Sequence, residues 1–292
     1  MRNDRLAAYQ EMIEAALEGY LPLPEAADLT APVKEAMRYS LLCGGKRIRP
    51  VLTLAFCELC GGSLKEALPF ACAVEMVHTY SLIHDDMPCM DDDDMRRGKP
   101  ANHKVFGEDI ALLAGDGLLT KAFETALSAE QKEPAAKAAL VLAKYAGEAG
   151  MVGGQCIDLK SEGQAAGLEL LLAMDTGKTA ALIEAACRMG CIAAEGGEQE
   201  QEAAGRYALG LGVAFQIRDD ILDLLGDPQK LGKNTGMDAA REKQNYVSLL
   251  GAEKAQQLVQ EYTKQAVDAL EAFSGDTTFL RELVESLENR EA

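Results

Sequence analysis

The sequence predicts an all-α protein. Apolar residues recur at spacings of three and four along most of the 292-residue chain, which places them on one face of an α-helix. The residues in and between these positions are mainly Ala, Leu, Glu, Lys and Met, which favour helices. We find no convincing alternation of apolar and polar residues of the kind that marks a half-buried strand. We therefore expect about ten core helices packed in one bundle.

The predicted helices follow one another with short connections. In chain order they are residues 3–19, 31–43, 50–60, 64–87, 109–128, 134–149, 165–174, 177–195, 199–225 and 247–273, with a shorter one near 277–289. The longest irregular stretch is 226–246, and a loop of that length in a compact fold is often functional. Since no low-complexity linker or fixed-period repeat divides the chain, we expect residues 1–292 to form a single domain.

Start and stop signals support the first helix boundaries. Thr30 stands where a helix cap is needed, Pro32 lies in the turn that follows, and Gly44 comes after the expected end. Pro50 opens the next helix in the same way. These residues predict two separate helices on either side of a glycine-containing turn.

The charge excludes one class of partner. The chain carries 29 Lys and Arg against 47 Asp and Glu, a net charge of −18, which repels phosphate backbones, so we expect no nucleic-acid partner. No apolar run approaches the ~20 residues of a membrane span, and the polar N-terminus lacks the apolar centre of a signal peptide. We expect a cytoplasmic protein whose eight scattered cysteines are reduced thiols.

The densest acidic cluster lies in residues 81–100. Six aspartates fall between positions 85 and 94, directly after an apolar helical segment and just before two arginines. Carboxylates clustered at a buried helix end repel one another unless cations bind them. Mg²⁺ suits a few carboxylates combined with phosphate oxygens. The cluster therefore favours a divalent-cation site over a solvated acidic face.

A second acidic block contains Asp219, Asp220 and Asp223. Asp219 and Asp223 are four residues apart, so on a helix they share a face. Because an apolar helical segment precedes this block too, the two blocks suggest two carboxylate walls facing each other across a cavity.

Helix geometry alone does not identify which aspartates of the first block bind the metal ion together. At ~100° per residue, Asp85 would align with Asp92 rather than with Asp91. Pro88 lies between them and cannot occupy an undisturbed helix interior. Since the backbone must bend there, the spacing alone does not choose the further ligand.

Basic residues accompany both acidic blocks. They are Lys46, Arg47 and Arg49 at a helix junction, Arg96 and Arg97 after the first block, Lys178 at the start of a helix, and Lys233 in the loop after the second block. Together they could offer a diphosphate direct contacts in addition to metal ions.

The residues suggest three alternative interpretations. His84 and Asp85, with His78, could indicate an HD-type metal phosphohydrolase, but the chain has only three histidines. A non-catalytic, acidic regulatory subunit is the second alternative, and the intact second block argues against it. A phosphate-binding loop at residues 175–179 lacks the required earlier glycine, because position 172 is a leucine.

The two acidic blocks resemble the aspartate-rich motifs of the trans-isoprenyl diphosphate synthases. The matching text is DDMPCMD at 85–91, followed by RRGKP, and DDILD at 219–223. GGKRIRP at 44–50, the GQ..D text at 154–158, the GKT text at 177–179 and FQIRDD at 215–220 are similar and occur in the same order. The bacterial farnesyl diphosphate synthase type is nearest, and plant-like geranylgeranyl synthases are close behind.

The resemblance implies a fold, a reaction and a role for each matching residue. It implies helices around a deep central cavity, a homodimer, and Mg²⁺-assisted condensation of an allylic diphosphate with isopentenyl diphosphate through an allylic carbocation. Asp85, Asp91, Asp219 and Asp223 would bind three Mg²⁺ ions with support from Asp86, and Arg96, Lys178 and Lys233 would contact the allylic diphosphate. Lys46, Arg49, His78 and Arg97 would hold isopentenyl diphosphate, and Thr179 and Gln216 would line the reacting region.

The resemblance also implies a product length. Tyr80 and Ser81 lie five and four residues before Asp85, about one helical turn below the metal site. An aromatic residue followed by a serine resembles the farnesyl-producing arrangement, so we expect a C15 product. Residues 243–247 depart from the family pattern, since they read KQNYV where K-[ST]-T-Y-P is common.

Overall fold

The computed structural model is all-α, as expected, apart from one very short hairpin. It describes residues 2–25, 27–161, 167–225 and 245–288. The elements are α1 (Arg2–Tyr20), α2 (Ala31–Leu41), α3 (Ile48–Leu59), α4 (Leu64–Asp85), β1 (Met95–Arg96), β2 (Lys99–Pro100), α5 (Asn102–Phe106), α6 (Glu108–Leu127), α7 (Lys132–Ala146), α8 (Met151–Ser161), α9 (Leu168–Asp175), the π-helix η1 (Thr176–Ala180), α10 (Ala181–Ala193), α11 (Glu198–Leu225), α14 (Tyr246–Leu250), α15 (Ala252–Ala269), the 3₁₀-helix η2 (Leu270–Ala272) and α16 (Thr278–Glu288).

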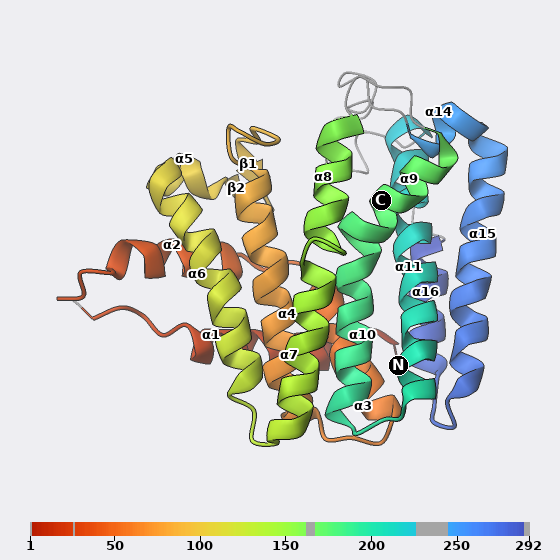
Figure 1. Ribbon diagram of the computed structural model, residues 1–292, viewed down its shortest axis with the longest axis horizontal. Coiled ribbons are helices and arrows are strands. Elements are labelled where there is room, and N and C mark those ends of the chain that lie inside the picture. The colour runs from red at the N-terminus through yellow and green to blue at the C-terminus, as the bar shows by residue number, and fades with distance from the viewer. Residues whose placement is uncertain (1, 26, 162–166, 226–244, 289–292) are drawn as a thin grey trace.

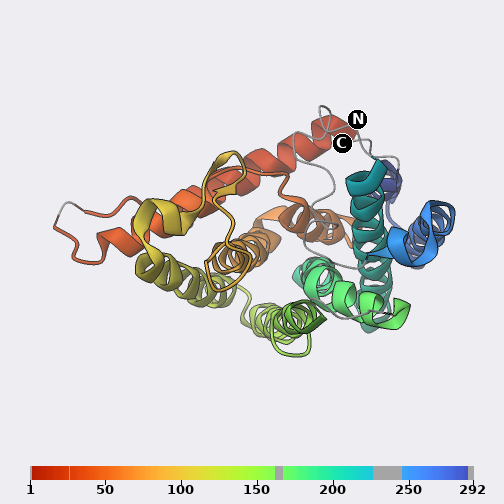
Figure 2. The same cartoon turned by 90° about the horizontal axis from the view of Figure 1, so that it is seen from above.

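The core is built around α3, α4 and α10. Residues 70–77 of α4 are buried without interruption, and nearly all of α10 is buried as well. Figures 1 and 2 show these helices surrounded by the others, with α1 lying along one side of the bundle. A second apolar cluster joins α11 to α14 and α15. A helix that is apolar on all sides is stable only in such an interior. This burial explains why residues 70–77 are mostly apolar.

Several predicted boundaries need correction. Thr30 precedes α2, but its side chain does not cap the helix, because its hydroxyl donates to the Asp28 carboxylate at 2.7 Å. Helix α3 begins at Ile48, so Pro50 lies inside the first turn rather than at its start. The predicted helix over 247–273 is divided at Gly251, whose φ of +81° falls in the left-handed region that glycine tolerates best.

Helix α8, the short helix α5 and the hairpin were not predicted from the sequence. Helix α8 occupies residues 151–161, between the predicted helices 134–149 and 165–174. The hairpin pairs Met95 with Pro100 and Arg96 with Lys99. Its strands have two residues each, too few to produce a visible alternation. All eight cysteines are free thiols, as expected.

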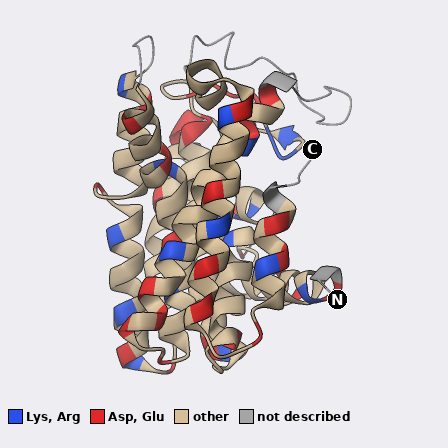
Figure 3. Ribbon diagram, turned by 90° about the vertical axis from the view of Figure 1, so that its right-hand side faces the viewer, with Lys and Arg blue, Asp and Glu red and all other residues tan. Residues whose placement is uncertain are grey.

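The elements that carry the acidic and basic motifs end at the same pole of the bundle. Figure 1 shows the C-terminal end of α4, the hairpin and α8 at this upper end. Figure 3, which views the molecule from the side, shows acidic and basic segments together there. None of the helices in the described ranges is long and apolar enough to cross a membrane.

Candidate active site

A cavity of about 480 Å³ opens beside the C-terminal end of α4. Its lining comes from α3, α4, α8, η1 and the turn after α4. Among the residues predicted for the site, Arg49, His78, Tyr80, Ser81, Asp85, Lys178 and Thr179 line it. Its lining also includes Met151, Val152 and Leu159 of α8, so the cavity combines charged residues with an apolar side.

The turn after α4 brings Asp91 back to Asp85. The Asp91 amide donates to the Asp85 carbonyl oxygen at 2.8 Å, and the Asp92 amide donates to the Met87 carbonyl at 3.2 Å. Asp92 adopts a left-handed φ of +51° and is exposed. Burial raises the pKa of Asp85 to about 6, and the Asp91 carboxylate adds to the rise. The bend therefore pairs Asp85 with Asp91, which helix-wheel arithmetic could not decide.

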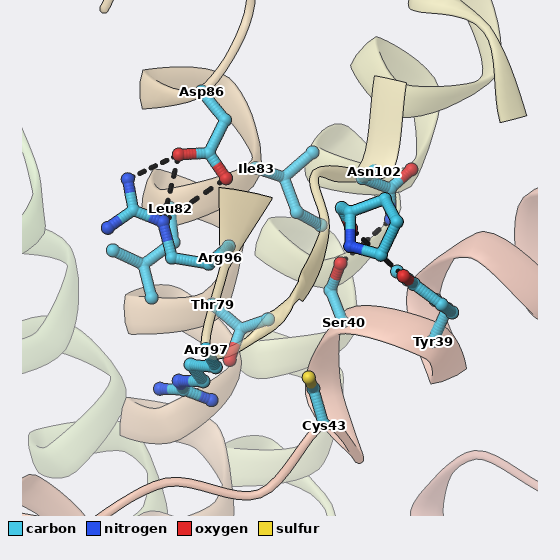
Figure 4. Close-up of a pocket in the computed structure, with 11 residues that line it drawn as sticks. Tyr39, Ser40, Cys43, Thr79, Leu82, Ile83, Asp86, Arg96, Arg97 and Asn102 are labelled. Carbon is cyan, nitrogen blue, oxygen red and sulfur yellow. Dashed lines mark hydrogen bonds and ion pairs between the residues drawn. The ribbon is translucent and has the colours of Figure 1, made fainter. Parts of the chain in front are cut away.

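Asp86 and Arg96 form an ion pair in which the carboxylate is buried and the guanidinium is partly exposed. Arg96 Nε donates to Asp86 Oδ1 at 2.9 Å, and Arg96 Nη2 donates to the same oxygen. Figure 4 shows the two groups face to face at the edge of a small cavity beside the main one. Asp86 thus holds the Arg96 guanidinium at the acidic turn.

Arg97 occupies the tight turn of the hairpin and points away from Asp86 (Figure 4). Its Nη1 donates to the Gly44 carbonyl at 2.6 Å. Gly45 has a φ of +129°, and a Cβ added there would lie 2.9 Å from the Arg97 Cζ atom. The glycine pair therefore gives the guanidinium a flat backbone surface to rest on, next to exposed Lys46.

Arg49 and His78 lie among further positive charges. Burial lowers the pKa of Arg49 to about 10, and the negative charge of Glu75 opposes this effect. Burial and the neighbouring arginines hold the pKa of His78 well below its usual value. His78 is therefore a neutral imidazole that can donate one hydrogen bond.

Lys178 and Thr179 lie on η1, where the helix widens by one residue per turn. Lys178 Nζ donates to Asp158 Oδ2 of α8 at 2.5 Å. The two helices touch through glycines, because a Cβ on Gly154 would lie 1.9 Å from the Lys178 backbone nitrogen. This contact fixes where Lys178 and Thr179 stand relative to α8.

The second acidic block lies near the C-terminal end of α11 and outside the lining of the cavity. Asp219, Asp223 and Gln216 are all partly exposed, and Asp220 accepts a hydrogen bond from the Tyr246 amide at 3.0 Å. Lys233 lies outside the described residues, as do positions 243 and 244 of the altered run. Asn245 is described and caps α14 by accepting from the Ser248 amide.

The donor set fits Mg²⁺ bound jointly with a diphosphate. In the part of the chain that the structure describes, no three His, Cys, Asp or Glu side chains stand close enough together to hold a metal by themselves. Mg²⁺ usually binds one or two carboxylates together with substrate phosphates rather than an all-protein cage. Asp85 and Asp91 offer such carboxylates, with cationic Arg96 and Lys178 near enough to influence Asp85.

Gln155 and Asp158 are site residues to which the sequence reasoning assigned no role. Both amide atoms of Gln155 are buried without a hydrogen-bond partner in the described structure, and its side chain lines the cavity. Asp158 is the partner of Lys178. The GQ..D motif at residues 154–158 points to these two residues in the sequence, but α8, the helix that carries them, was not predicted.

Comparisons with known proteins agree with this geometry. The family model described as Polyprenyl synthetase matches residues 30–277. The chain is 47% identical over 274 residues to "Heterodimeric geranylgeranyl pyrophosphate synthase large subunit 1, chloroplastic" of Arabidopsis thaliana, covering 91% of this chain and 73% of that protein. It is 43% identical over 290 residues to farnesyl diphosphate synthase of Bacillus subtilis (strain 168), covering 98% and 97%.

Solved structures give the same result. The apo FPP/GFPP synthase from Zymomonas mobilis superposes with a TM-score of 0.87 at 35% identity, covering 99% of this chain and 100% of that one. The geranylgeranyl pyrophosphate synthetase from Pyrococcus horikoshii Ot3 gives a TM-score of 0.89 at 30% identity, with 99% of each covered. The fold is therefore that of the isoprenoid synthases, and the chain belongs to the polyprenyl synthetase family as a trans-prenyl diphosphate synthase.

Proposed function

We propose that this prenyltransferase condenses dimethylallyl and geranyl diphosphates with isopentenyl diphosphate to give farnesyl diphosphate. The observation that carries the proposal is the position of Tyr80, a bulky, 7%-exposed side chain in the cavity lining about one turn below Asp85. The near full-length match to the Bacillus farnesyl diphosphate synthase supports it.

Mg²⁺ is the cofactor in this proposal. Asp85 and Asp91 of the first acidic block and Asp219 and Asp223 of the second would hold the Mg²⁺ ions. When bound, the ions neutralise charge that develops on the departing diphosphate.

The side chains divide between the two diphosphates. Arg96, Lys178 and Lys233 bind the allylic diphosphate, whereas Lys46, Arg49, Arg97 and neutral His78 bind isopentenyl diphosphate. The apolar wall of α8 keeps water from the allylic cation, next to Thr179 and Gln216. The proton released after the new carbon–carbon bond forms is accepted by the departed diphosphate.

A C20 product is the second candidate. The observation that favours it is the identity of 46–48% to plant proteins named geranylgeranyl pyrophosphate synthases. Incubation with dimethylallyl diphosphate, isopentenyl diphosphate and Mg²⁺, followed by mass analysis of the products, separates the two. Mainly C15 supports the proposal, mainly C20 replaces it with the second candidate, and no prenyl product overturns both.

Asp85→Asn tests the metal site directly. Loss of one preorganised charge should lower turnover by on the order of 10²-fold or more while the helical content stays unchanged. Asp92→Asn is the matched control, because Asp92 is exposed and asparagine tolerates its left-handed φ of +51°. If both variants keep near-normal turnover, the assignment of Asp85 is wrong.

We also propose that the enzyme works as a homodimer. Leu112, Leu113 and Leu127 of α6 are each about half exposed, at 46%, 52% and 50%, and several large apolar side chains on one helix surface favour an interaction with another protein surface. Sedimentation analysis should give twice the chain mass, and Leu113→Asp should shift the protein towards the monomer.

A further inference from the structure

A buried carboxylate, Glu75, lies among three arginines, Arg47, Arg49 and Arg97, which form the arginine cluster. Glu75 of α4 is 1% exposed, and its Oε1 atom lies 2.5 Å from Arg47 Nη1 and 3.5 Å from Arg97 Nη2. Its charge also acts on Arg49. A buried charge is stable only when it is paired, so this single anion is tied to several cations at once.

Arg47 fills the inner side of this cluster and has a second anion. Its side chain is fully buried, and its φ of +51° at the start of α3 is unusual for a residue with a side chain. It donates to Glu14 of α1 at 2.7 Å, to Glu75 and to the Leu41 carbonyl at 2.7 Å. Loss of one carboxylate therefore leaves Arg47 with the other.

Arg97 depends on Glu75 more strongly. Its side chain is 20% exposed and lines the small cavity beside the main one, and the proposed function assigns it to isopentenyl diphosphate. Its other recorded partner is neutral, the Gly44 carbonyl. Among the described residues, Glu75 is the one carboxylate that forms an ion pair with Arg97. Without it, the guanidinium would be repelled by Arg49 and Arg47 with no opposing charge to hold its orientation.

We propose that Glu75 is a positioning residue that holds Arg97 ready for the diphosphate of isopentenyl diphosphate. The inference rests on the proposed function of that pocket. A guanidinium already fixed in orientation loses less conformational freedom when it binds a phosphate, so the anion beneath it increases affinity without touching substrate. Glu75 acts on one of the two substrates, because Arg96 of the allylic side has its own carboxylate in Asp86.

Glu75→Gln tests this role. The variant keeps the size of the side chain and removes its charge. The KM for isopentenyl diphosphate should rise about tenfold, the size of effect expected when a charged hydrogen bond is weakened, while kcat and the KM of the allylic substrate change less than about twofold. Calorimetric binding of isopentenyl diphosphate alone should weaken by the same factor.

Glu14→Gln is the matched control. Glu14 pairs with the same Arg47 but has no recorded contact with Arg97. This variant should leave both KM values within about twofold of those of the natural protein. If Glu75→Gln does not fold, the double variant Glu75→Gln, Arg47→Gln also removes the buried positive charge that Glu75 helps to neutralise, and it should show the same selective rise in KM.

The outcomes separate the inference from the proposed function. Equal changes in both KM values, no change, or the same selective rise in Glu14→Gln would overturn the role of Glu75. Failure of the natural protein to bind isopentenyl diphosphate in the calorimeter would overturn the inference as well. Binding without prenyl transfer would overturn the proposed function and leave the calorimetric comparison of the variants to decide on Glu75.

Discussion

Tyr80 is the residue on which the proposed product length depends. Its ring is 7% exposed and meets the His84 ring edge-on at a centroid distance of 5.7 Å. His84 is held in turn by Leu112, whose carbonyl oxygen lies 3.1 Å from its Nε2 atom. Gly115 leaves the space for the imidazole, since a Cβ there would lie 2.1 Å from that nitrogen. The tyrosine therefore rests on a partner that cannot easily move aside.

We expect Tyr80→Ala to lengthen the product. Removal of a large aromatic side chain opens space below the metal site, so a C15 intermediate can be extended to C20. Ser81→Phe is the converse change and should shorten the main product to C10. Mass analysis of the products measures both. An unchanged distribution in Tyr80→Ala would move the limit to a neighbouring helix such as α6 (Glu108–Leu127).

Asp175 gives the protein a pH-dependent stability. The side chain is 3% exposed, and burial raises its pKa from 3.8 to about 6, with a further contribution from Asp158. Because the folded pKa lies above the unfolded value, the native state binds the proton more tightly. The stability that this gives is complete below pH 4 and is lost as the pH rises through 6.

Asp175→Asn should therefore stabilise the protein at neutral pH. The amide resembles the protonated carboxyl, so the free energy of unfolding at pH 8 should rise by about 1–3 kcal/mol. At pH 4 the variant and the natural protein should differ little. Urea unfolding at the two pH values measures this effect, and an equal difference at both would contradict it.

The acidic blocks could be found in the sequence, but helix geometry could not show which aspartate of the first block lies beside Asp85. Clusters of aspartates next to apolar helices are visible in the sequence, and so is the distance between them. Asp91 returns to Asp85 through one backbone hydrogen bond to the Asp85 carbonyl, which depends on how the chain folds at Pro88. The ion pair between Asp86 and Arg96 depends on the hairpin in the same way.

Among the helices, α8 and η1 show why local propensity is a weak guide. Gly150, Gly153 and Gly154 lower the helix propensity of this segment, because isolated glycines weaken a helix. In the fold, Gly154 and Gly177 let the two backbones touch. The energy of that contact depends on an element far along the chain, so local propensity could not predict it.

Gly154→Ala tests that contact. The added methyl group would overlap the Lys178 backbone, so we expect the free energy of unfolding to fall by about 1–3 kcal/mol, with a loss of turnover as Lys178 is displaced. Gly19→Ala makes the same change in α1, where no atom lies within 4 Å of the new Cβ. This control should be neutral or more stable by up to about 1 kcal/mol. Similar losses in both variants would argue against a special contact.

For the whole molecule, the net charge of −18 and an anionic substrate impose a condition on binding. Under the proposed function, diphosphate would approach where bound metal ions and the basic side chains reverse the local negative field. The order of the helices and the overall class were predictable because periodicity is distributed along the whole chain. The cavity could not be predicted, because its shape depends on how α3, α4, α8 and η1 pack against one another.

Mg²⁺ together with inorganic diphosphate should raise the melting temperature. A ligand pair that binds only the folded state at 100 times its dissociation constant contributes about 2.7 kcal/mol, or roughly 5–10 °C for a chain of this size. Differential scanning calorimetry measures the shift. Diphosphate with a chelator is the control and should give little change, and an equal rise without metal would argue against joint binding.

Under the proposed function, the cavity along α4 would set product length by the distance from Asp85 to the first bulky side chain. The diphosphate end of each substrate would bind at the same place whatever the length of its tail. Substitutions deeper in the cavity should therefore change the product by whole isoprene units. Substitutions at Asp85 should change the rate of turnover and leave the product length unchanged.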